Sequence, residues 1–301
     1  MSLTVVKSRR TKILADIPVE LKSIVKTPII VTPDTSILDG RDLLLRYNIS
    51  RLIVVSNKNP VGVITEKDIT RSVSVPGGKP LEKISVGDIM SKDLVVAKIS
   101  SSIYECARLM KKHGISSIIV EDDAQKLVGI VTKTDLVSTF LVQSTASLNV
   151  SKIMTKNVIT VSTDDSVFVV QSILVNNQIG RVVVTQNQQP VGIITYRDFI
   201  PAKTFDFQKA FTNPIEREEL YQTPQLNEFN VNKLSYMLTF SAKDIMTKNP
   251  FIVYSDDVVY TAAILMIRHG ISGIPVMKNK HLVGIVTKSD IVNVLAAKGK
   301  L

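Results

Sequence analysis

Four stretches of this sequence share one pattern: GVITEKD (62–68), GIVTKTD (129–135), GIITYRD (192–198) and GIVTKSD (284–290). Each reads as glycine, two apolar residues, threonine, two variable residues and aspartate. The recurrence of one string along a chain indicates a repeated structural unit. The four glycines lie 67, 63 and 92 residues apart, so three units follow one another directly and an insertion precedes the fourth.

A second string opens the units and stands about 40 residues before the glycine of the first string. It reads DIMSKDLVV from Asp88, KIMTKNVITV from Lys152 and DIMTKNPFIV from Asp244. The first unit carries a degenerate version, SIVKTPIIV from Ser23. The sequence therefore holds four copies of one unit, each with an opening and a closing string.

The residues between the two strings predict a strand, a helix, two strands and a final helix. Apolar residues at helical spacing, as in Ile37, Leu44 and Leu45, follow a candidate cap such as Asp34, or Asp257 in the fourth copy. RLIVV, SNKNP and VGVIT then read as two strands joined by a polar turn. We expect an α/β (α+β) fold of four β-α-β-β-α repeats, with each final helix beginning after the recurring threonine.

The spacing also sets the expected domain boundaries. We place a basic N-terminal arm at 1–20, the first two repeats at 21–80 and 81–146, the third at 147–200 and the fourth at 242–301. The insertion, 201–241, holds seven of the sixteen Phe and Tyr residues of the chain. Such a segment forms a small core of its own or supplies aromatic anchors for a partner.

Composition limits the class of protein. The 301 residues contain one cysteine, Cys106, which allows no internal disulfide and fits a small buried residue in a reducing compartment. The first twenty residues lack the apolar core of a signal peptide, and no apolar run has the length of a membrane span. We therefore expect a soluble cytoplasmic protein. The net charge of +10 is concentrated at the two ends of the chain, which favours an anionic partner such as RNA but also fits solvated lysines.

With these strings and HGISGIPV from His269, the chain resembles the CBS domain family over nearly its whole length. The resemblance implies that repeats pair into pseudo-twofold Bateman modules, the first repeat with the second and the third with the fourth. It also implies clefts for adenosine-containing ligands: AMP, ADP, ATP or S-adenosylmethionine. No cofactor or metal is required.

The resemblance assigns ligand contacts to the closing string. Its aspartate would bind the ribose hydroxyls and its threonine would lie near the phosphates, which gives Thr65 and Asp68, Thr132 and Asp135, Thr195 and Asp198, and Thr287 and Asp290. A structural alternative stands beside this one, because Thr-x-x-Asp before a helix is close to a capping box. The glycine is expected to be structural, at a close backbone approach or a turn.

A phosphate group requires cations, and the position of the candidate cation alternates between odd-numbered and even-numbered repeats. Arg51 and Arg181 stand before the central strand of the first and third repeats, where similar proteins often contact phosphate. Lys133 and Lys288 follow the threonine of the second and fourth repeats and could complement the arginines across a module. The alternative is that all four are surface charges.

The sequence contains neither a P-loop nor a GxGxxG motif, so we expect a non-enzymatic protein that acts through another molecule. One hypothesis is an energy-sensing regulator that binds an adenine nucleotide and then a protein partner. The other is a ribosome- or RNA-associated factor, for example one that silences translation. Either could exist as a monomer or as a homodimer through its modules. The expected partner contacts are Lys7, Arg9, Arg10 and Lys12 in the arm and Phe205, Phe207 and Phe211 in the insertion.

Overall fold

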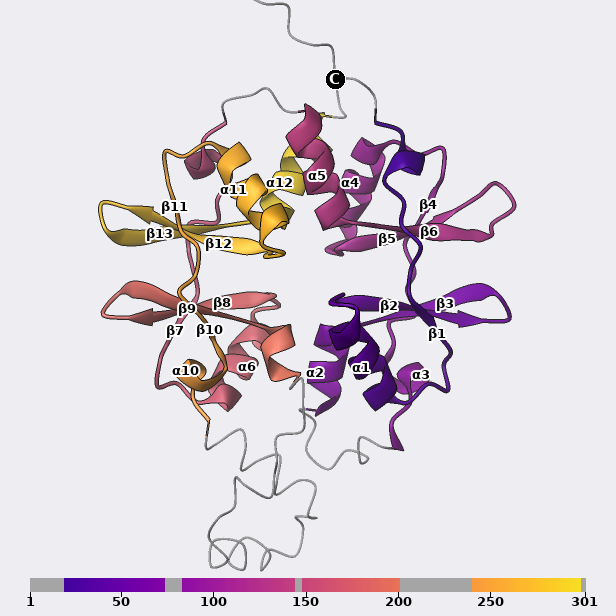
Figure 1. Cartoon of the computed structure of the whole chain (residues 1–301), viewed down its shortest axis with the longest axis horizontal. Helices are drawn as coiled ribbons and strands as arrows, with labels where there is room; N and C mark the ends of the chain where they lie inside the picture. Colours follow the sequence, from indigo (N-terminus) through magenta and orange to yellow (C-terminus); the bar gives the residue numbers. More distant parts are fainter. Residues whose placement is uncertain (1–18, 74–82, 144–147, 201–239, 299–301) are drawn as a thin grey trace, which may run out of the picture.

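The computed structural model describes residues 19–73, 83–143, 148–200 and 240–298 (Figure 1). These residues fold into four units that repeat the predicted order of strands and helices. The first unit contains η1 (Leu21–Ser23), β1 (Ile30–Val31), α1 (Ile37–Arg46), β2 (Arg51–Ser56), β3 (Asn59–Thr65) and α2 (Glu66–Val73). The second contains α3 (Val86–Ile89), β4 (Val96–Lys98), α4 (Ile103–His113), β5 (Ser117–Glu121), β6 (Leu127–Thr132) and α5 (Lys133–Gln143).

The second half of the chain repeats this order. The third unit contains η3 (Val150–Lys152), β7 (Thr160–Ser162), α6 (Val167–Asn176), β8 (Arg181–Gln186), β9 (Gln189–Thr195) and η4 (Tyr196–Phe199). The fourth contains α10 (Ala242–Ile245), β10 (Thr247–Lys248), β11 (Val253–Tyr254), α11 (Val259–Arg268), β12 (Gly273–Lys278), β13 (His281–Thr287) and α12 (Lys288–Lys298). The predicted mixed fold of four repeats is confirmed. In the third unit the element after the threonine is the short 3₁₀ helix η4.

Local signals explain most of these elements. The N-caps of α1, α4 and α6 are Ser36, Ser102 and Ser166, whose side chains accept hydrogen bonds from backbone N–H groups of the first turn. The turns after β2, β8 and β12 place two consecutive residues at positive φ, as in Asn57 and Lys58, which suits a two-residue hairpin. The predicted caps are wrong, because Ser36 and Val258, not Asp34 and Asp257, directly precede the helices.

Strand exchange joins the units in pairs. In each unit the hairpin pairs with one parallel strand, as β1 does with β2. The opening segment of each unit crosses to the hairpin of the other unit in its half of the chain. These pairs are Lys26 with Ile130, Ser91 with Val63, Thr155 with Ile285, and β10 with β9. The predicted pairing of the first unit with the second, and of the third with the fourth, is confirmed.

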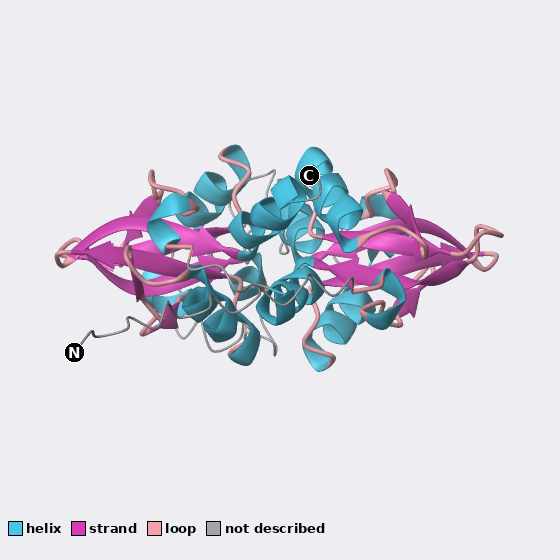
Figure 2. Cartoon of the chain, turned by 90° about the horizontal axis from the view of Figure 1, so that it is seen from above, coloured by secondary structure: helices cyan, strands magenta, loops and turns pink. Residues whose placement is uncertain are grey.

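The two modules lie side by side, with their strands at opposite ends of the molecule and helices between them (Figure 2). Different elements form the contact between the modules at its two ends. Helices α4 and α5 pack on α11 and α12 around one apolar core that contains Met110, Phe140, Met266 and Leu295 (Figure 1, top). Cys106 is buried in the same core, as predicted. At the other end, α2 meets η4. Among the described residues, no helix combines the length and apolarity that a membrane span requires.

Candidate functional site

The four Thr–Asp pairs have one geometry. Each threonine ends the last strand of its hairpin, and each aspartate lies in the first turn of the helix that follows. One carboxylate oxygen, Oδ2, accepts hydrogen bonds from the backbone N–H and from the hydroxyl of the threonine. The respective distances are 2.8 and 2.6 Å for Asp68, 2.8 and 2.6 Å for Asp135, 2.6 and 2.9 Å for Asp198, and 2.7 and 2.7 Å for Asp290. The capping role anticipated for these residues is therefore present in all four units.

Capping occupies only one oxygen of each carboxylate, and the second oxygen distinguishes the units. Within the described residues, Oδ1 of Asp68, Asp198 and Asp290 accepts no hydrogen bond from protein. Burial raises the pKa of Asp198 and Asp290, although the hydrogen bonds from their threonines act in the opposite direction. Oδ1 of Asp135 is 2.6 Å from Nζ of Lys26. Three aspartates thus keep an acceptor for a ligand, and the fourth is engaged.

The two recurring strings meet at the glycines. A Cβ atom on any of these glycines would collide with the opening segment of the other unit in the module. The colliding pairs are Gly62 with Met90, Gly129 with Val25, Gly192 with Met246, and Gly284 with Met154. The structural role predicted for the glycine is confirmed, because only a residue without a side chain admits the crossing segment. The opening segment of one unit therefore packs against the closing string of the other unit in its module, three residues before the threonine of the Thr–Asp pair. We number the places of the four Thr–Asp pairs sites 1 to 4 by the unit that supplies the aspartate.

A groove of about 500 Å³ opens beside site 4. It is lined by Lys152 and Ile153 from the opening segment of the third unit, and by Asp290, Asn293, Val294, Ala297 and Lys298 from α12. The groove is shallow and open to solvent, and it brings together a carboxylate, apolar side chains and two lysines from two units.

Arg51 and Arg181 reach from the odd-numbered units into the even-numbered ones. Nη1 of Arg51 donates to the carbonyl oxygen of Ser116 at 2.6 Å. Arg181 lies against Gly273, where a Cβ atom would collide with Nη1 of the arginine. Burial lowers the pKa of each guanidinium to about 10. Nη1 of Arg181 is buried and has no hydrogen-bond partner among the described residues.

Lys133 and Lys288 lie at the N-termini of α5 and α12, where the modules meet. Nζ of Lys133 donates to Oγ of Ser289 at 2.8 Å, and Nζ of Lys288 donates to Oγ1 of Thr134 at 3.0 Å. The pKa of each lysine is lowered to about 8, mainly by burial and then by the charges of Arg181 and Arg51. The four cations predicted from the sequence therefore converge on one region between the modules, and each unit supplies one.

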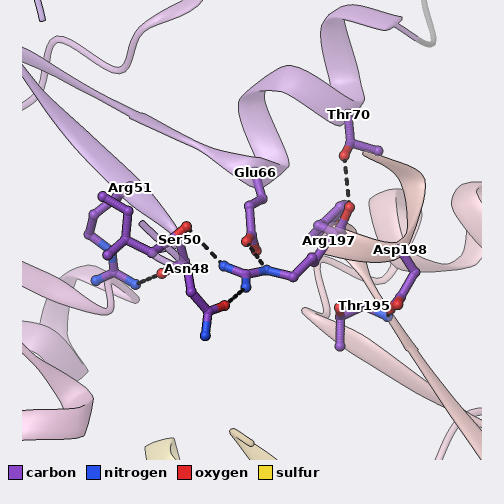
Figure 3. Close-up of polar contacts among 10 residues, drawn as sticks. Asn48, Ser50, Arg51, Glu66, Thr70, Thr195, Arg197 and Asp198 are labelled. Carbon is purple, nitrogen blue, oxygen red and sulfur yellow. Dashed lines mark hydrogen bonds and ion pairs between the residues drawn. The ribbon is translucent and has the colours of Figure 1, made fainter. Parts of the chain in front are cut away.

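Sequence reasoning missed Arg197, which joins the odd-numbered units (Figure 3). Its Nε is 2.5 Å from Oε1 of Glu66, and its other nitrogens donate to Oδ1 of Asn48 and to the carbonyl oxygen of Ile49. Burial raises the pKa of Glu66, against the effect of Arg197. Glu66 occupies the place where the even-numbered units carry Lys133 and Lys288 and the third unit carries Tyr196, so a single acid at this position was the signal available in the sequence.

The predicted partner contacts lie outside the described residues. This applies to Lys7, Arg9, Arg10 and Lys12, and to Phe205, Phe207 and Phe211. They remain predictions.

Comparisons with known proteins agree with this architecture. The family model for the CBS domain matches residues 21–75, 86–141, 150–203 and 242–297. An uncharacterized protein of Methanocaldococcus jannaschii is 27% identical over 285 residues, which are 90% of this chain and 60% of that protein, so the chain spans less than two thirds of its length. Inosine-5'-monophosphate dehydrogenase of Bacillus subtilis is 30% identical over 119 residues, 38% of this chain but 23% of the enzyme.

Solved structures also match nearly the whole chain. One of them is a protein of M. jannaschii described as a candidate archaeal homologue of γ-AMPK. It is 20% identical, covers 92% of this chain and 100% of its own, and superposes with a TM-score of 0.76. The likeness shows a shared fold. Because the family model matches all four units, this chain belongs to the CBS domain family.

Proposed function

We propose that this protein is a non-enzymatic, cytoplasmic regulator that binds an adenosine-containing ligand between its units and signals through a partner. The ligand class is AMP, ADP, ATP or S-adenosylmethionine. The ribose hydroxyls are held by the free oxygen of an aspartate, and the phosphates or the charged end of the ligand point toward the four cations. No bound metal or cofactor is needed for this function.

The convergence of Arg51, Arg181, Lys133 and Lys288 carries the proposal. Like charges brought together in a partly buried place destabilise the folded protein unless an anion joins them. Asp135, Asp290 and Glu66 offset part of this positive charge. The pKa of both lysines is nevertheless lowered, mainly by burial and then by the two arginines, and Nη1 of Arg181 has no partner among the described residues, so the compensation within the protein is incomplete. A phosphate group offers several oxygens that accept hydrogen bonds from guanidinium and ammonium groups at once.

The aspartates supply the second half of the recognition. A carboxylate oxygen accepts hydrogen bonds from hydroxyl groups, and Oδ1 of Asp68, Asp198 and Asp290 is open for this purpose. Capping by the threonine holds each carboxylate in a fixed orientation, so capping and ligand binding support one another. At these three sites one aspartate can therefore cap its helix through Oδ2 and bind a ligand through Oδ1.

A ligand in this place can act as a signal because its contacts come from different units and modules. Lys133 and Lys288 belong to different modules, and a phosphate that contacts both favours one arrangement of the modules over others. A ligand shifts a conformational equilibrium only by its difference in affinity for the two states. The changed surface would then be recognised by a protein partner.

The test is calorimetric titration of the full chain with AMP, ADP, ATP and S-adenosylmethionine. Binding by the wild type, weakened by Asp290→Asn but not by Asp256→Asn, would support the proposal. Asp256 is a suitable control because it lies in the same unit outside the Thr–Asp pair. Absence of binding for all four compounds at millimolar concentration would refute it.

Association with RNA or a ribosome is the alternative, and one described feature favours it. A groove of about 440 Å³ is lined by Arg108, Lys111, Lys112, Ala296 and Ala297, which places three basic residues of α4 beside the C-terminal part of α12. Phosphate-driven binding of RNA should weaken steeply with salt. Sedimentation of the native protein with ribosomal particles at low but not high salt, and its loss in Lys111→Ala/Lys112→Ala, would support this function. Sedimentation apart from ribosomes at every salt concentration would exclude it.

A further inference from the structure

Lys26 breaks the symmetry of the four sites. The opening segment of each unit crosses the hairpin of its partner unit at an equivalent residue. At this position the second, third and fourth units carry the hydroxyl residues Ser91, Thr155 and Thr247. The first unit carries Lys26, which pairs with Ile130 directly over site 2. A long cation therefore replaces a short hydroxyl side chain at one of the four crossings.

The consequence is visible at Asp135. Its Oδ2 accepts hydrogen bonds from Thr132, as in the other units, while its Oδ1 lies 2.6 Å from Nζ of Lys26. The Asp135 side chain is only 3% exposed, whereas that of Lys26 is 67% exposed. Both oxygens of this carboxylate are thus used by the protein, and Lys26 lies over it from the solvent side.

We propose that Lys26 closes site 2 to nucleosides, so that ligand binding is confined to sites 1, 3 and 4. The inference rests on the proposed function, because it concerns the same carboxylate–ribose contact. A ribose that approached Asp135 would have to replace a charged hydrogen bond with neutral ones. A hydrogen bond between charged groups is roughly twice as strong as a neutral one, and the difference corresponds to roughly 5- to 10-fold in affinity.

Lys26 therefore determines the number of ligands per chain. Replacing it with serine, the residue found at the equivalent crossing over site 1, should release Oδ1 of Asp135 and open site 2. The backbone pairing of residue 26 with Ile130 does not involve the side chain, so the crossing itself should persist.

The experiment is equilibrium dialysis of the full chain with labelled AMP and, separately, labelled S-adenosylmethionine. Four variants are compared with the wild type: Lys26→Ser, Asp135→Asn, the double variant, and Asp290→Asn as the positive control for an open site. We expect Lys26→Ser to bind one more ligand at saturation than the wild type, and the double variant to lose that gain. Asp135→Asn alone should leave the wild-type number unchanged, whereas Asp290→Asn should lower it by one.

Two results would overturn the inference while leaving the proposed function intact. One is a wild type that binds ligand and loses a site on Asp135→Asn. The other is a Lys26→Ser variant that binds no more ligand than the wild type, or less, which would mean that Lys26 assists binding. If neither probe binds the wild type or any variant, the proposed function fails and this inference fails with it. Circular dichroism of each variant would confirm that a change in binding does not reflect loss of folding.

Discussion

Lys133 donates a hydrogen bond to Ser289 across the boundary between the two modules, with 2.8 Å between Nζ and Oγ. The contact is reciprocated, because Lys288 donates to Thr134 from the opposite side. Two helices thus present their N-termini and a lysine to each other, with Arg51 and Arg181 close enough to affect both lysines. An anion placed here would contact both halves of the chain.

The affinity for AMP should fall as the pH rises from 7 to 9. Lys133 and Lys288 have a pKa of about 8, so each is mainly charged at pH 7 and mainly neutral at pH 9. Loss of one charged hydrogen bond corresponds to about tenfold or more in affinity. Calorimetric titration at the two pH values measures the effect. In a Lys133→Met/Lys288→Met variant the dependence should be much smaller.

The ligand-free protein should show the opposite trend in stability. Because the pKa of both lysines is lower in the folded protein than in the unfolded chain, the unfolded chain binds more protons between about pH 8 and 10.5. The contribution of these lysines to the free energy of unfolding therefore increases with pH over that range. Thermal denaturation of the wild type and the double methionine variant would isolate it. An identical pH profile for both proteins would contradict the assignment.

Replacing Arg181 with methionine should separate binding from stability. Nη1 of Arg181 is buried without a partner, so its removal should leave the ligand-free protein as stable as the wild type or more stable. AMP affinity should fall roughly 10- to 100-fold, because a charged donor to phosphate is lost. Arg51→Met is the matched comparison and should also destabilise the protein, because Arg51 donates to the carbonyl oxygen of Ser116. A strongly destabilised Arg181→Met would indicate a structural role.

The contact between Arg197 and Glu66 should stabilise the packing of the two modules at the end where α2 meets η4. A double-mutant cycle with Arg197→Ala and Glu66→Ala should give a coupling free energy of about 2 kcal/mol, since a charged hydrogen bond with limited exposure is broken. Arg41→Ala offers a control, because Arg41 pairs with the exposed Asp42 and should contribute less than about 1 kcal/mol. Chemical denaturation measures both. Additive effects of the two substitutions would show that the pair does not stabilise the interface.

Gly129→Ala should destabilise the first module, by about 1–3 kcal/mol. A Cβ atom at Gly129 would lie 2.6 Å from the carbonyl oxygen of Lys26, which is backbone and cannot rotate away. Gly180→Ala is the natural control, because a Cβ atom at that position meets nothing within 4 Å. The two melting temperatures should therefore differ clearly. Equal stabilities would mean that the crossing segment is not held against Gly129.

Repetition made much of this molecule predictable from its sequence. The closing string predicted the hairpins, the structural role of the glycines and the Thr–Asp pairs, because each of these depends on residues that recur at the same place in every unit. The arginine and lysine positions also followed, since they stand at fixed distances from that string. The caps were harder: Asp34 was expected to cap α1, but Ser36 stands directly before the helix and accepts the hydrogen bond from its first turn.

The contacts that differ between units could not be predicted in the same way. Lys26 and Asp135 lie more than a hundred residues apart, and their meeting depends on which opening segment crosses which hairpin. Arg197 stands at a variable position of its string, so its contact with Glu66 follows only from the packing of η4 on α2. Asymmetry of this kind appears once the units are placed in space.

Comparison of AMP with adenosine tests the central claim most directly. Both carry the same ribose and base, so they differ only in the phosphate that the four cations are proposed to receive. Calorimetric titration of the full chain at pH 7 should give AMP an affinity about tenfold or more above that of adenosine, and Arg181→Met should remove most of this difference. Equal affinities for AMP and adenosine in the wild type, or no binding of either at millimolar concentration, would contradict the account.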